Sequence, residues 1–350
     1  MRVLQLIDSL HPGGAERIAV TFANALQGRI SGSYLCTTRE EGLLKTDLHE
    51  KVGYLFLRKK GSLDLGALLR LKRYIKKENI GIVHAHTSSY FIAILLKFSY
   101  PKIQIIWHEH QGNRVHLSRL QNLPLYVCSF FFTKIITVNT ALEYWCREKL
   151  ATKEVQYLPN FISVCTNKTM SQQREDTIIC VANLKAPKNH LNLLKAFAIV
   201  HIEYPEWKLN LVGKDFQDSY ANVLHAFVVE EHLQEHVRFS GSTNSVQQMM
   251  QVASIGVLSS DDEGLPMVLL EYGTSGLAVV ATRVGQCEEV ISTFGKTIEP
   301  KDENALAKAL IHYIENEHER NKDAAAYSLH IVKRYGTEAI LPMLLTIYNK

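Results

Sequence analysis

Residues 259–276 read SSDDEGLPMVLLEYGTSG, and this stretch joins an apolar strand to a helix through a short polar turn. The apolar run ends at Ser260, and Glu263 and Gly264 form the turn. Pro266 suits the first position of the helix, where its missing N–H costs nothing. The amino terminus of a helix offers free amides and a positive dipole end, which suit a diphosphate. The stretch therefore predicts a strand–turn–helix unit with an anion site at the turn.

Two carboxylates of this unit form an E-x7-E pattern. Glu263 lies at the turn, and Glu271 lies within the predicted helix. Carboxylates in these places can accept hydrogen bonds from sugar and ribose hydroxyls. The alternative is that Glu263 only caps the helix and that Glu271 is solvated.

The rest of the chain alternates strand-like apolar runs with helical stretches, which indicates βαβ units and parallel sheets. The runs before the middle of the chain are VLQLIDSL (3–10), SYLCTT (33–38), GYLFL (53–57), GIVHAH (81–86), IQIIWHEH (103–110) and KIITVN (134–139). The pattern restarts after the polar stretch 166–176, with TIICVANL (177–184), WKLNLVG (207–213), HVRFSG (236–241), IGVLSS (255–260) and AVVATR (278–283). We interpret 166–176 as the linker between two doubly wound α/β sheets, and we expect ligands beyond the carboxyl ends of their strands.

The charge distribution also favours two domains, 1–165 and 166–330, followed by a helical segment, 331–350. Residues up to 165 carry a net charge of +10, from 22 basic and 12 acidic side chains, whereas the remainder carries −6, from 17 basic and 23 acidic ones. No apolar run reaches the ~18 residues that a membrane-spanning helix needs. The first ten residues lack the features of a signal peptide, so a cytosolic protein with reduced, mostly buried cysteines is expected.

The string E-G-L-P-x-V-x-L-E, followed by G-x-A-V-V-A-T-x-x-G, resembles the donor-site signature of the family 4 retaining glycosyltransferases. The resemblance implies the GT-B architecture, in which two Rossmann-like domains face each other across a cleft. It also implies that Glu263 contacts the donor sugar and that Glu271 binds the nucleotide ribose. Gly264, Leu265 and Pro266 would then lie near the sugar donor.

The segment VANLKAPKNHLNLLKAF (181–197) resembles the part of the family that binds the diphosphate. Lys188 falls on the family's lysine position. Asn183 stands where an arginine is usual, and it supplies a hydrogen-bond donor without a charge. Lys185 is a candidate to compensate for that missing cation.

The first strand-like run leads into LHPGGAER (10–17), which resembles the family's amino-terminal glycine loop. Glycine lets the backbone approach a ligand without a Cβ clash. Gly13 and Gly14 would present amides to the phosphate or to the transferred sugar, and Glu16 and Arg17 are expected to fix the loop. The family also predicts that the carboxy-terminal helical segment returns to the first domain.

Two His-x-His pairs end strand-like runs: His84 with His86, and His108 with His110. Alternate strand residues share a face, so each pair invites comparison with a metal site. No carboxylate or cysteine cluster completes either pair, and the family is metal-independent, so no metal is expected. By resemblance, His110 contacts the transferred sugar or orients the acceptor, with His108 as the alternative, and His86 supports the loop.

The resemblance implies transfer of a sugar from a nucleotide-diphosphate sugar to a glycan or lipid-linked acceptor, with retention of anomeric configuration and without a cofactor. Lys188, Glu263 and His110 are the predicted catalytic residues. By the same resemblance, the departing phosphate itself takes the acceptor proton, so no general base is assigned. The expected setting is surface polysaccharide or glycoconjugate biosynthesis. No nucleic-acid-binding module is recognisable.

Two segments of the basic half suggest a peripheral contact with an anionic membrane at its inner face. Residues 57–77 mix leucines with many lysines and arginines, and residues 123–132 are strongly apolar. The alternatives are a solvated helix face and a buried core helix.

Two other functions remain open from the sequence. One is a sugar-nucleotide epimerase on the same architecture, and the other is a non-catalytic nucleotide-sugar-binding protein. A Rossmann oxidoreductase is disfavoured, because no G-x-G-x-x-G follows the first strand with an acidic residue ~20 positions on.

Overall fold

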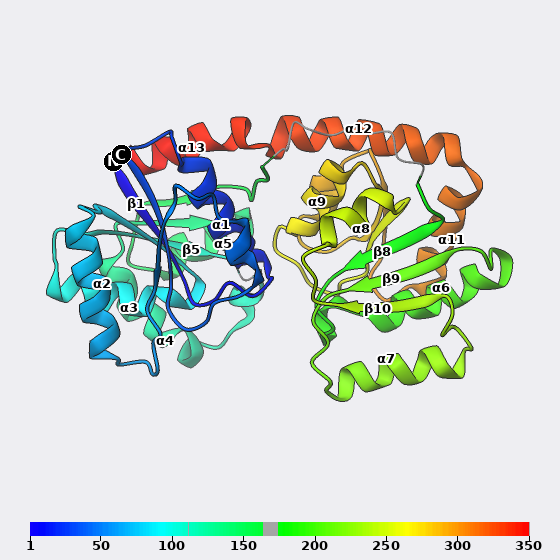
Figure 1. The fold of residues 1–350 in the computed structure, drawn as a ribbon, viewed down its shortest axis with the longest axis horizontal. Helices are drawn as coiled ribbons and strands as arrows, with labels where there is room; N and C mark the ends of the chain where they lie inside the picture. The colour runs from blue at the N-terminus through cyan, green and yellow to red at the C-terminus, as the bar shows by residue number, and fades with distance from the viewer. Residues whose placement is uncertain (111, 164–173, 350) are drawn as a thin grey trace. The chain divides into compact units, whose positions relative to one another are not determined.

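The structure of the protein is a computed structural model that describes residues 1–110, 112–163 and 174–349 (Figure 1). The chain forms two compact units. The first comprises Met1–Ser163 together with Thr337–Lys350, and the second comprises Val164–Gly336. The predicted linker, 166–176, lies outside the described residues up to residue 173.

The first unit contains a seven-stranded sheet in the order β3-β2-β1-β4-β5-β6-β7, with every pair parallel. Its strands are β1 (Arg2–Ile7), β2 (Gly32–Thr37), β3 (Gly53–Phe56), β4 (Ile82–His86), β5 (Gln104–Glu109), β6 (Lys134–Thr137) and β7 (Val155–Tyr157). Its helices are α1 (Gly14–Leu26), α2 (Leu65–Lys77), α3 (Tyr90–Ser99), α4 (Arg119–Cys128), α5 (Thr140–Lys149) and α13 (Thr337–Asn349).

The two faces of this sheet differ in polarity, because strand residues alternate in direction. One face carries the apolar residues of β1, β4 and β5, and it packs against α2, α3 and α4. The members of this face that the central strands supply are Leu4, Leu6, Val83, Ala85, Ile105 and Trp107. The alternating positions on the other face include Gln5, His84, His86 and His108, all fully buried.

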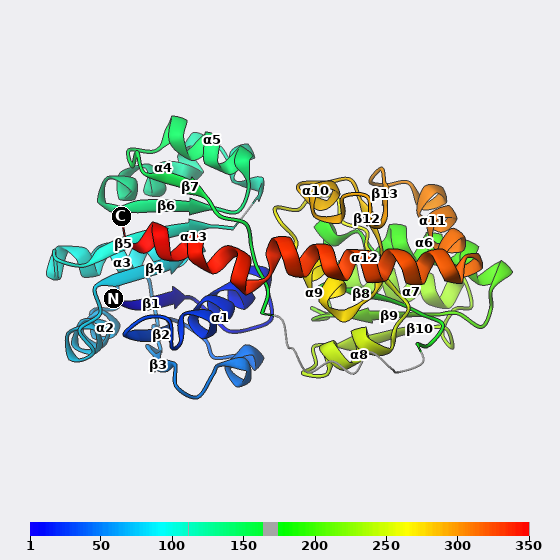
Figure 2. The ribbon, with the colours of Figure 1, turned by 90° about the horizontal axis from the view of Figure 1, so that it is seen from above.

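Helix α13 covers that polar face together with α1 (Figure 2). Its residue Tyr348 bonds to Gln5 and His84 inside the sheet. The Lys134 side chain donates to the carbonyl of Ile347, and Thr337 N donates to the carbonyl of Ile162. The last helix of the chain is thus built into the first sheet.

The second unit contains a six-stranded parallel sheet in the order β10-β9-β8-β11-β12-β13. Its strands are β8 (Thr177–Val181), β9 (Lys208–Val212), β10 (Val237–Gly241), β11 (Ile255–Leu258), β12 (Ala278–Thr282) and β13 (Lys296–Ile298). Its helices are α6 (His190–Glu203), α7 (Ser219–Glu230), α8 (Val246–Val252), α9 (Met267–Ser275), α10 (Cys287–Ile291), α11 (Glu303–Glu315) and α12 (Glu317–Tyr335), with the 3-10 turn η5 (Ala186–Lys188) before α6.

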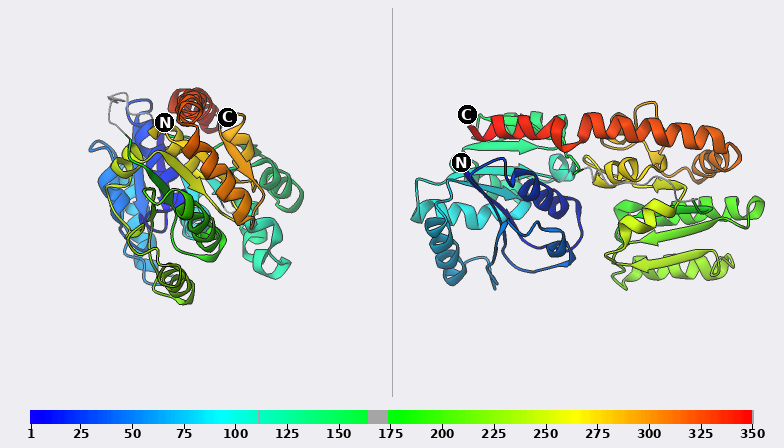
Figure 3. Two further views of the ribbon diagram at one scale, coloured as in Figure 1. Left: turned by 90° about the vertical axis from the view of Figure 1, so that its right-hand side faces the viewer. Right: turned by 45° about the horizontal axis from the view of Figure 1, so that its top comes forward.

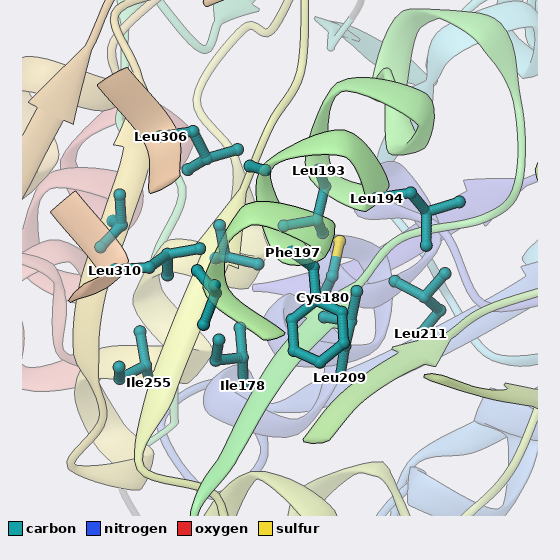
Figure 4. Close-up of a cluster of buried hydrophobic side chains, with 14 of the residues drawn as sticks. Ile178, Cys180, Leu193, Leu194, Phe197, Leu209, Leu211, Ile255, Leu306 and Leu310 are labelled. Atoms are coloured by element: carbon teal, nitrogen blue, oxygen red, sulfur yellow. The ribbon is translucent and has the colours of Figure 1, made fainter. Parts of the chain in front are cut away.

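Helices cover both faces of this sheet. Figure 1 shows α6 and α7 on one side of the strands and α8 and α9 on the other. Leu193, Leu194 and Phe197 of α6 interdigitate with Ile178 and Leu209 of the sheet (Figure 4). Full burial of each such side chain stabilises the fold by ~1.5–3 kcal/mol. On the opposite face α12, drawn in orange-red, lies along α9 (Figure 3).

The predicted fold class is confirmed, since both sheets are parallel, α/β and doubly wound. Each predicted strand corresponds to an observed one. Two further strands, β7 and β13, were not predicted; they have three residues each and lie at sheet edges. Among the described residues, no helix has the length and apolar character that crossing a bilayer requires.

Candidate functional site

The polar turn after β11 is held at the carboxyl edge of the second sheet. The carbonyl of Ser260 accepts a hydrogen bond of 2.6 Å from Thr282 Oγ1, the last residue of β12. The Ser260 hydroxyl in turn donates to Glu263 Oε1, also across 2.6 Å. The strand end therefore fixes the Glu263 carboxylate from one side.

Lys188 approaches the same carboxylate from another loop. Its Nζ donates to Glu263 Oε1 across 2.5 Å, and only 22% of the lysine side chain and 10% of the glutamate side chain are exposed. Partial burial reduces solvent screening, so this pair interacts more strongly than a surface ion pair. The structure thus brings together two of the predicted catalytic residues.

The loop that carries Lys188 is tied to the end of β11 by three hydrogen bonds. Asn189 Nδ2 donates to Asp261 Oδ1 across 2.8 Å, and Asp261 N donates to the carbonyl of Pro187, also across 2.8 Å. Ser259 Oγ donates to the carbonyl of Lys188 across 3.0 Å. The position of Lys188 is therefore set by backbone and side-chain contacts on both sides of it.

Helix α9 begins at Met267, so Pro266 is its N-cap residue and not its first helical residue as predicted. Pro266 adopts an extended conformation and has no side-chain cap to offer the first amides. Gly264 is anchored through its carbonyl, which accepts from Gln286 N across 3.0 Å. Leu265 and Pro266 are buried beside it. The amino terminus of α9 thus presents backbone amides beside a loop that is held in place.

Two glycines of the signature have positive φ angles. Gly276 ends α9 in the left-handed conformation, with φ +71°. Gly285, with φ +51°, runs so close to the turn that a Cβ there would lie 2.2 Å from the carbonyl oxygen of Glu263. These positions require glycine for local backbone reasons.

Glu271 lies in the second turn of α9 and is nearly buried, with 9% of the residue exposed. Its neighbour Tyr272 fixes the helix to the sheet, because the Tyr272 hydroxyl bonds to Val181 N across 2.9 Å and to the carbonyl of Val257 across 3.1 Å. The interpretation of Glu271 as a fully solvated helix residue is therefore wrong.

Asn183 follows β8 at the same edge of the sheet. Its Oδ1 accepts from the backbone N–H of Lys214 across 2.9 Å, so it joins the loops after β8 and β9. Lys185 and Lys214 are exposed at this edge. Two lysines are therefore present in the loops around the position where the expected arginine is absent.

In the first unit, Gly13 caps α1 and Gly14 is its first residue. A Cβ on Gly13 would lie 2.3 Å from Glu16 Oε2, whereas a Cβ on Gly14 would meet no atom within 4 Å. Packing within the described residues therefore does not demand glycine at position 14. The Glu16 carboxyl group lies against the loop.

The four histidines of the His-x-His pairs gather in the first unit, where burial lowers the pKa of each ring. The pKa of His110 falls to about 3, and those of His84, His86 and His108 also lie well below 6.5. His86 Nδ1 lies 2.9 Å from His110 Nε2, and His84 Nε2 lies 3.2 Å from His108 Nδ1. All four rings are therefore neutral at physiological pH.

Three of these rings lie close enough together to be compared with a metal site: those of His84, His86 and His108. Both ring nitrogens of His84 and of His86 already have hydrogen-bond partners. A metal ion would need their lone pairs to converge on one point, at ~2.0–2.1 Å from each nitrogen. The observed geometry is that of a hydrogen-bonded network.

Several residues of these sites carry no motif and were not predicted. Ser260 and Asp261 fix Glu263 and Lys188, and Gln5 and Tyr348 bond to the histidines. Ser260 and Asp261 stand within the stretch 259–276, but the sequence does not reveal which residues their side chains contact. Only the alternation of Gln5 with apolar residues in a strand marks it as a buried polar group.

Sequence comparisons place both halves of the chain in one class of enzyme. Residues 12–164 match the family described as Glycosyltransferase Family 4, and residues 166–328 match the family described as Glycosyl transferases group 1. The chain therefore belongs to the family 4, or group 1, glycosyltransferases, and the resemblance in its motifs is confirmed.

Individual relatives agree with this assignment. The chain is 25% identical over 279 residues to an uncharacterized glycosyltransferase of Haemophilus influenzae, which covers 77% of this chain and 76% of that protein. It is 23% identical to the capsular polysaccharide biosynthesis glycosyltransferase CapH of Staphylococcus aureus, over 89% of this chain and 91% of CapH.

Solved structures share the fold. HepE of Anabaena, crystallised with UDP and glucose, is 18% identical and covers 100% of this chain and 99% of its own, with a TM-score of 0.85. TarM of Staphylococcus aureus is 11% identical and has a TM-score of 0.82, covering 100% of this chain and 99% of its own. At these identities the likeness concerns the fold, which is that of GT-B glycosyltransferases.

Proposed function

We propose that the protein is a retaining, metal-independent glycosyltransferase that moves a sugar from a nucleotide-diphosphate donor to a glycan or lipid-linked acceptor. The observation that carries the proposal is the pairing of Lys188 with Glu263 beside the amino terminus of α9. One cation, one carboxylate and a helix amino terminus at one sheet edge supply the contacts that a sugar diphosphate needs.

In the proposed sugar-donor complex, Lys188 and the amides near Pro266 bind the diphosphate. Glu263 is then released from Lys188 and accepts hydrogen bonds from the donor sugar. Glu271 binds the nucleotide ribose. Asn183 contributes a hydrogen bond, and the charge that it lacks comes from Lys188 and from the exposed Lys185 or Lys214.

In the proposed reaction, the bond between the anomeric carbon and the phosphate oxygen breaks as the acceptor oxygen attacks from the same side. The acceptor proton passes to the departing phosphate, so no protein carboxylate acts as a nucleophile. Lys188 and the helix amides stabilise the charge that develops on the diphosphate. Gly13, Gly14 and His110 are proposed to contact the phosphate or the transferred sugar.

We place the reaction in surface polysaccharide or glycoconjugate biosynthesis. Support comes from relatives that span nearly the whole chain: CapH, the amylovoran biosynthesis glycosyltransferase AmsD of Erwinia amylovora and the O-antigen biosynthesis glycosyltransferase WbnH of Escherichia coli. HepE was solved with UDP-glucose, which makes uridine diphosphate sugars the first donors to test.

The test is a transfer assay on a donor found by screening sugar nucleotides for thermal stabilisation. The Glu263→Ala variant should lose nearly all transfer, whereas Asp262→Ala, which alters an exposed neighbour, should keep it. Near-normal turnover by a folded Glu263→Ala protein would refute the proposed role.

The same assay separates the other candidate functions. Altered free sugar would indicate the epimerase, and donor binding without any turnover would indicate the non-catalytic protein. The anomeric configuration of the product, read by NMR, tests retention.

We also propose that the first unit binds an anionic membrane surface, where a lipid-linked acceptor would lie. Helix α4 and the turn after it expose Leu120, Leu123, Val127 and Phe130, between 53% and 81% of each residue. Their spacing of three and four residues puts them on one side of the helix. An apolar stripe of this kind is typical of helices that lie in a bilayer interface.

Helix α3 connects the segment after α4 with a lysine of α2. Phe98 of α3 contacts Phe131 after α4, and Lys76 of α2 lies over the ring of Tyr100 at the end of α3. Helix α2 itself packs Ala67, Leu71 and Ile75 into the core and keeps its cations outside. The apolar face of α2 is therefore part of the core, as the alternative of a buried core helix predicted. The cations of α2 complement anionic headgroups.

Co-sedimentation with vesicles tests this contact. The protein should bind vesicles that contain phosphatidylglycerol and not pure phosphatidylcholine, and Leu123→Glu with Phe130→Glu should abolish binding. Ile202→Glu, which adds a charge at a residue that is 82% exposed in the second unit, should bind as wild type does. Equal binding by the wild type and the double variant would refute the proposal.

A further inference from the structure

The four histidines of the His-x-His pairs form two hydrogen-bonded branches that start at Gln5. One branch runs from Gln5 Oε1 to His86 Nε2, across 2.8 Å, and from His86 Nδ1 to His110 Nε2. The other runs from Gln5 Nε2 to the Tyr348 hydroxyl, across 3.2 Å, to His84 Nδ1, across 2.6 Å, and on to His108. A single amide therefore bonds to both branches.

The donor and acceptor chemistry of the first branch fixes its protons. Gln5 Oε1 can only accept, so His86 Nε2 carries the proton. His86 is buried and neutral, so its Nδ1 is a bare acceptor, and His110 Nε2 must be the donor. The planes of these two rings differ by only 18°, which is compatible with an in-plane N–H···N bond. His110 Nδ1 is then left without a proton.

In the second branch the hydrogen bonds are donated in the direction away from Gln5, whereas in the first branch they are donated towards it. Gln5 Nε2 donates to the Tyr348 oxygen, so the Tyr348 proton goes to His84 Nδ1. His84 Nε2 then donates to His108 Nδ1, and His108 Nε2 keeps a proton. The His84 and His108 ring planes differ by only 12°. Both branches end on buried nitrogens, His108 Nε2 and His110 Nδ1, which have no hydrogen-bond partner among the described residues.

We propose that Gln5 is a positioning residue, which fixes the tautomers of the histidines so that His110 presents a bare Nδ1 acceptor and His108 an Nε2–H donor. Phe22 packs against the His84, His86 and His108 rings and keeps this network dry. A buried acceptor without a hydrogen bond is unfavourable, so a ligand that donates a hydrogen bond to it is favoured. In the sugar-transfer function proposed above, on which this last step rests, His110 Nδ1 accepts a hydrogen bond from a hydroxyl of the sugar.

The tautomers can be read directly by long-range ¹H–¹⁵N NMR of the full-length protein labelled at histidine, with the His110 signals assigned through His110→Asn. The wild type should show a pyridine-type Nδ1 and a pyrrole-type Nε2 for both His110 and His108. His86 should share that pattern, as should His84. A protonated Nδ1 on His110, or fast exchange between tautomers, would overturn the proposal. This readout needs neither a sugar substrate nor activity.

Two variants separate the branches. Tyr348→Phe removes the hydroxyl that orients His84, so His84 and His108 should show mixed tautomers while His86 and His110 stay as in the wild type. Gln5→Leu removes the shared amide, so both branches should become mixed. Unchanged nitrogen shifts in Gln5→Leu would contradict the role of Gln5.

Activity completes the test. Gln5→Leu should lower kcat/KM by about tenfold, the worth of one hydrogen bond of ~1.4 kcal/mol. A loss of activity without a change in the His110 tautomer would refute positioning through His110. A changed tautomer with unchanged kcat/KM would refute only the contact between His110 and the sugar, which separates the failure of that step from a failure of the tautomer assignment.

Discussion

Lys188 Nζ donates to Glu263 Oε1 across 2.5 Å, so a predicted diphosphate-binding cation is held by a predicted sugar-binding carboxylate. A bound diphosphate must compete with this carboxylate for the lysine. The two residues therefore oppose each other in nucleotide binding, although both are proposed to serve transfer.

The pair predicts opposite effects of two substitutions on nucleotide affinity. Lys188→Met removes the cation and leaves an uncompensated carboxylate, so the Kd for uridine diphosphate should rise at least about tenfold. Glu263→Gln removes the negative charge that competes for Lys188, so the Kd should stay equal or fall. Isothermal titration calorimetry measures both. A weaker affinity in Glu263→Gln with an intact fold would show that the carboxylate does not compete.

Gly285 should not tolerate a side chain. A Cβ would meet the carbonyl of Glu263 at 2.2 Å on a backbone with φ +51°, so Gly285→Ala should lower the free energy of unfolding by about 1–3 kcal/mol. Urea denaturation gives this value. Gly81→Ala is the matched control, because a Cβ there meets nothing within 4 Å, and it should be close to neutral. Equal stability of the two variants would contradict the close approach.

The buried histidines should make the first unit acid-labile. Burial holds the folded-state pKa of His84, His86, His108 and His110 below the ordinary value of 6.5, whereas the unfolded rings gain protons below about that pH. The contribution of these rings to the free energy of unfolding should therefore be constant well above pH 6.5 and should fall by up to ~1.4 kcal/mol per pH unit for each histidine below about that pH.

Tryptophan fluorescence can follow this loss in one unit. A Trp207→Phe variant keeps Trp107 and Trp145, both in the first unit, as reporters of urea unfolding between about pH 7.5 and pH 5. A midpoint that is independent of pH over this range would mean that the rings are protonated equally in the folded and unfolded states.

The thiols of Cys180 and Cys287 should resist alkylation in the native state. Burial raises the pKa of both to about 12, and only the thiolate reacts quickly. Mass spectrometry after iodoacetamide treatment at about pH 8 should find both unmodified, and both should be modified in denaturant. Modification at equal rates in the two conditions would contradict their burial.

The sequence predicts the strands well because each central strand is a short apolar run between turn residues. The alternation of apolar and polar residues does not reveal β7 and β13, because a strand of three residues is too short to show a period. The apolar residues 123–132 suggested a membrane-binding surface, but the sequence did not show which of their side chains are exposed. They lie in α4 and the turn that follows, with Leu125 buried and Leu123 exposed.

The candidate site was predictable where residues are close in sequence, and less so where contacts are distant. The turn at Glu263 and the helix after it belong to one short stretch. The contact of Glu263 with Lys188 joins residues 75 positions apart, and only the motif resemblance placed both at one site. The bond between Gln5 and Tyr348 spans 343 positions and has no motif.

That last bond has a consequence for biosynthesis. The ribosome releases residues 1–163 long before α13, yet Tyr348 and Lys134 join that helix to the interior of the first sheet. The first unit must therefore wait, with the part of its polar face that α13 covers still open, until the whole second unit has been synthesised. Domains usually complete folding in the order of their translation. In this chain, the unit that is translated first is finished last.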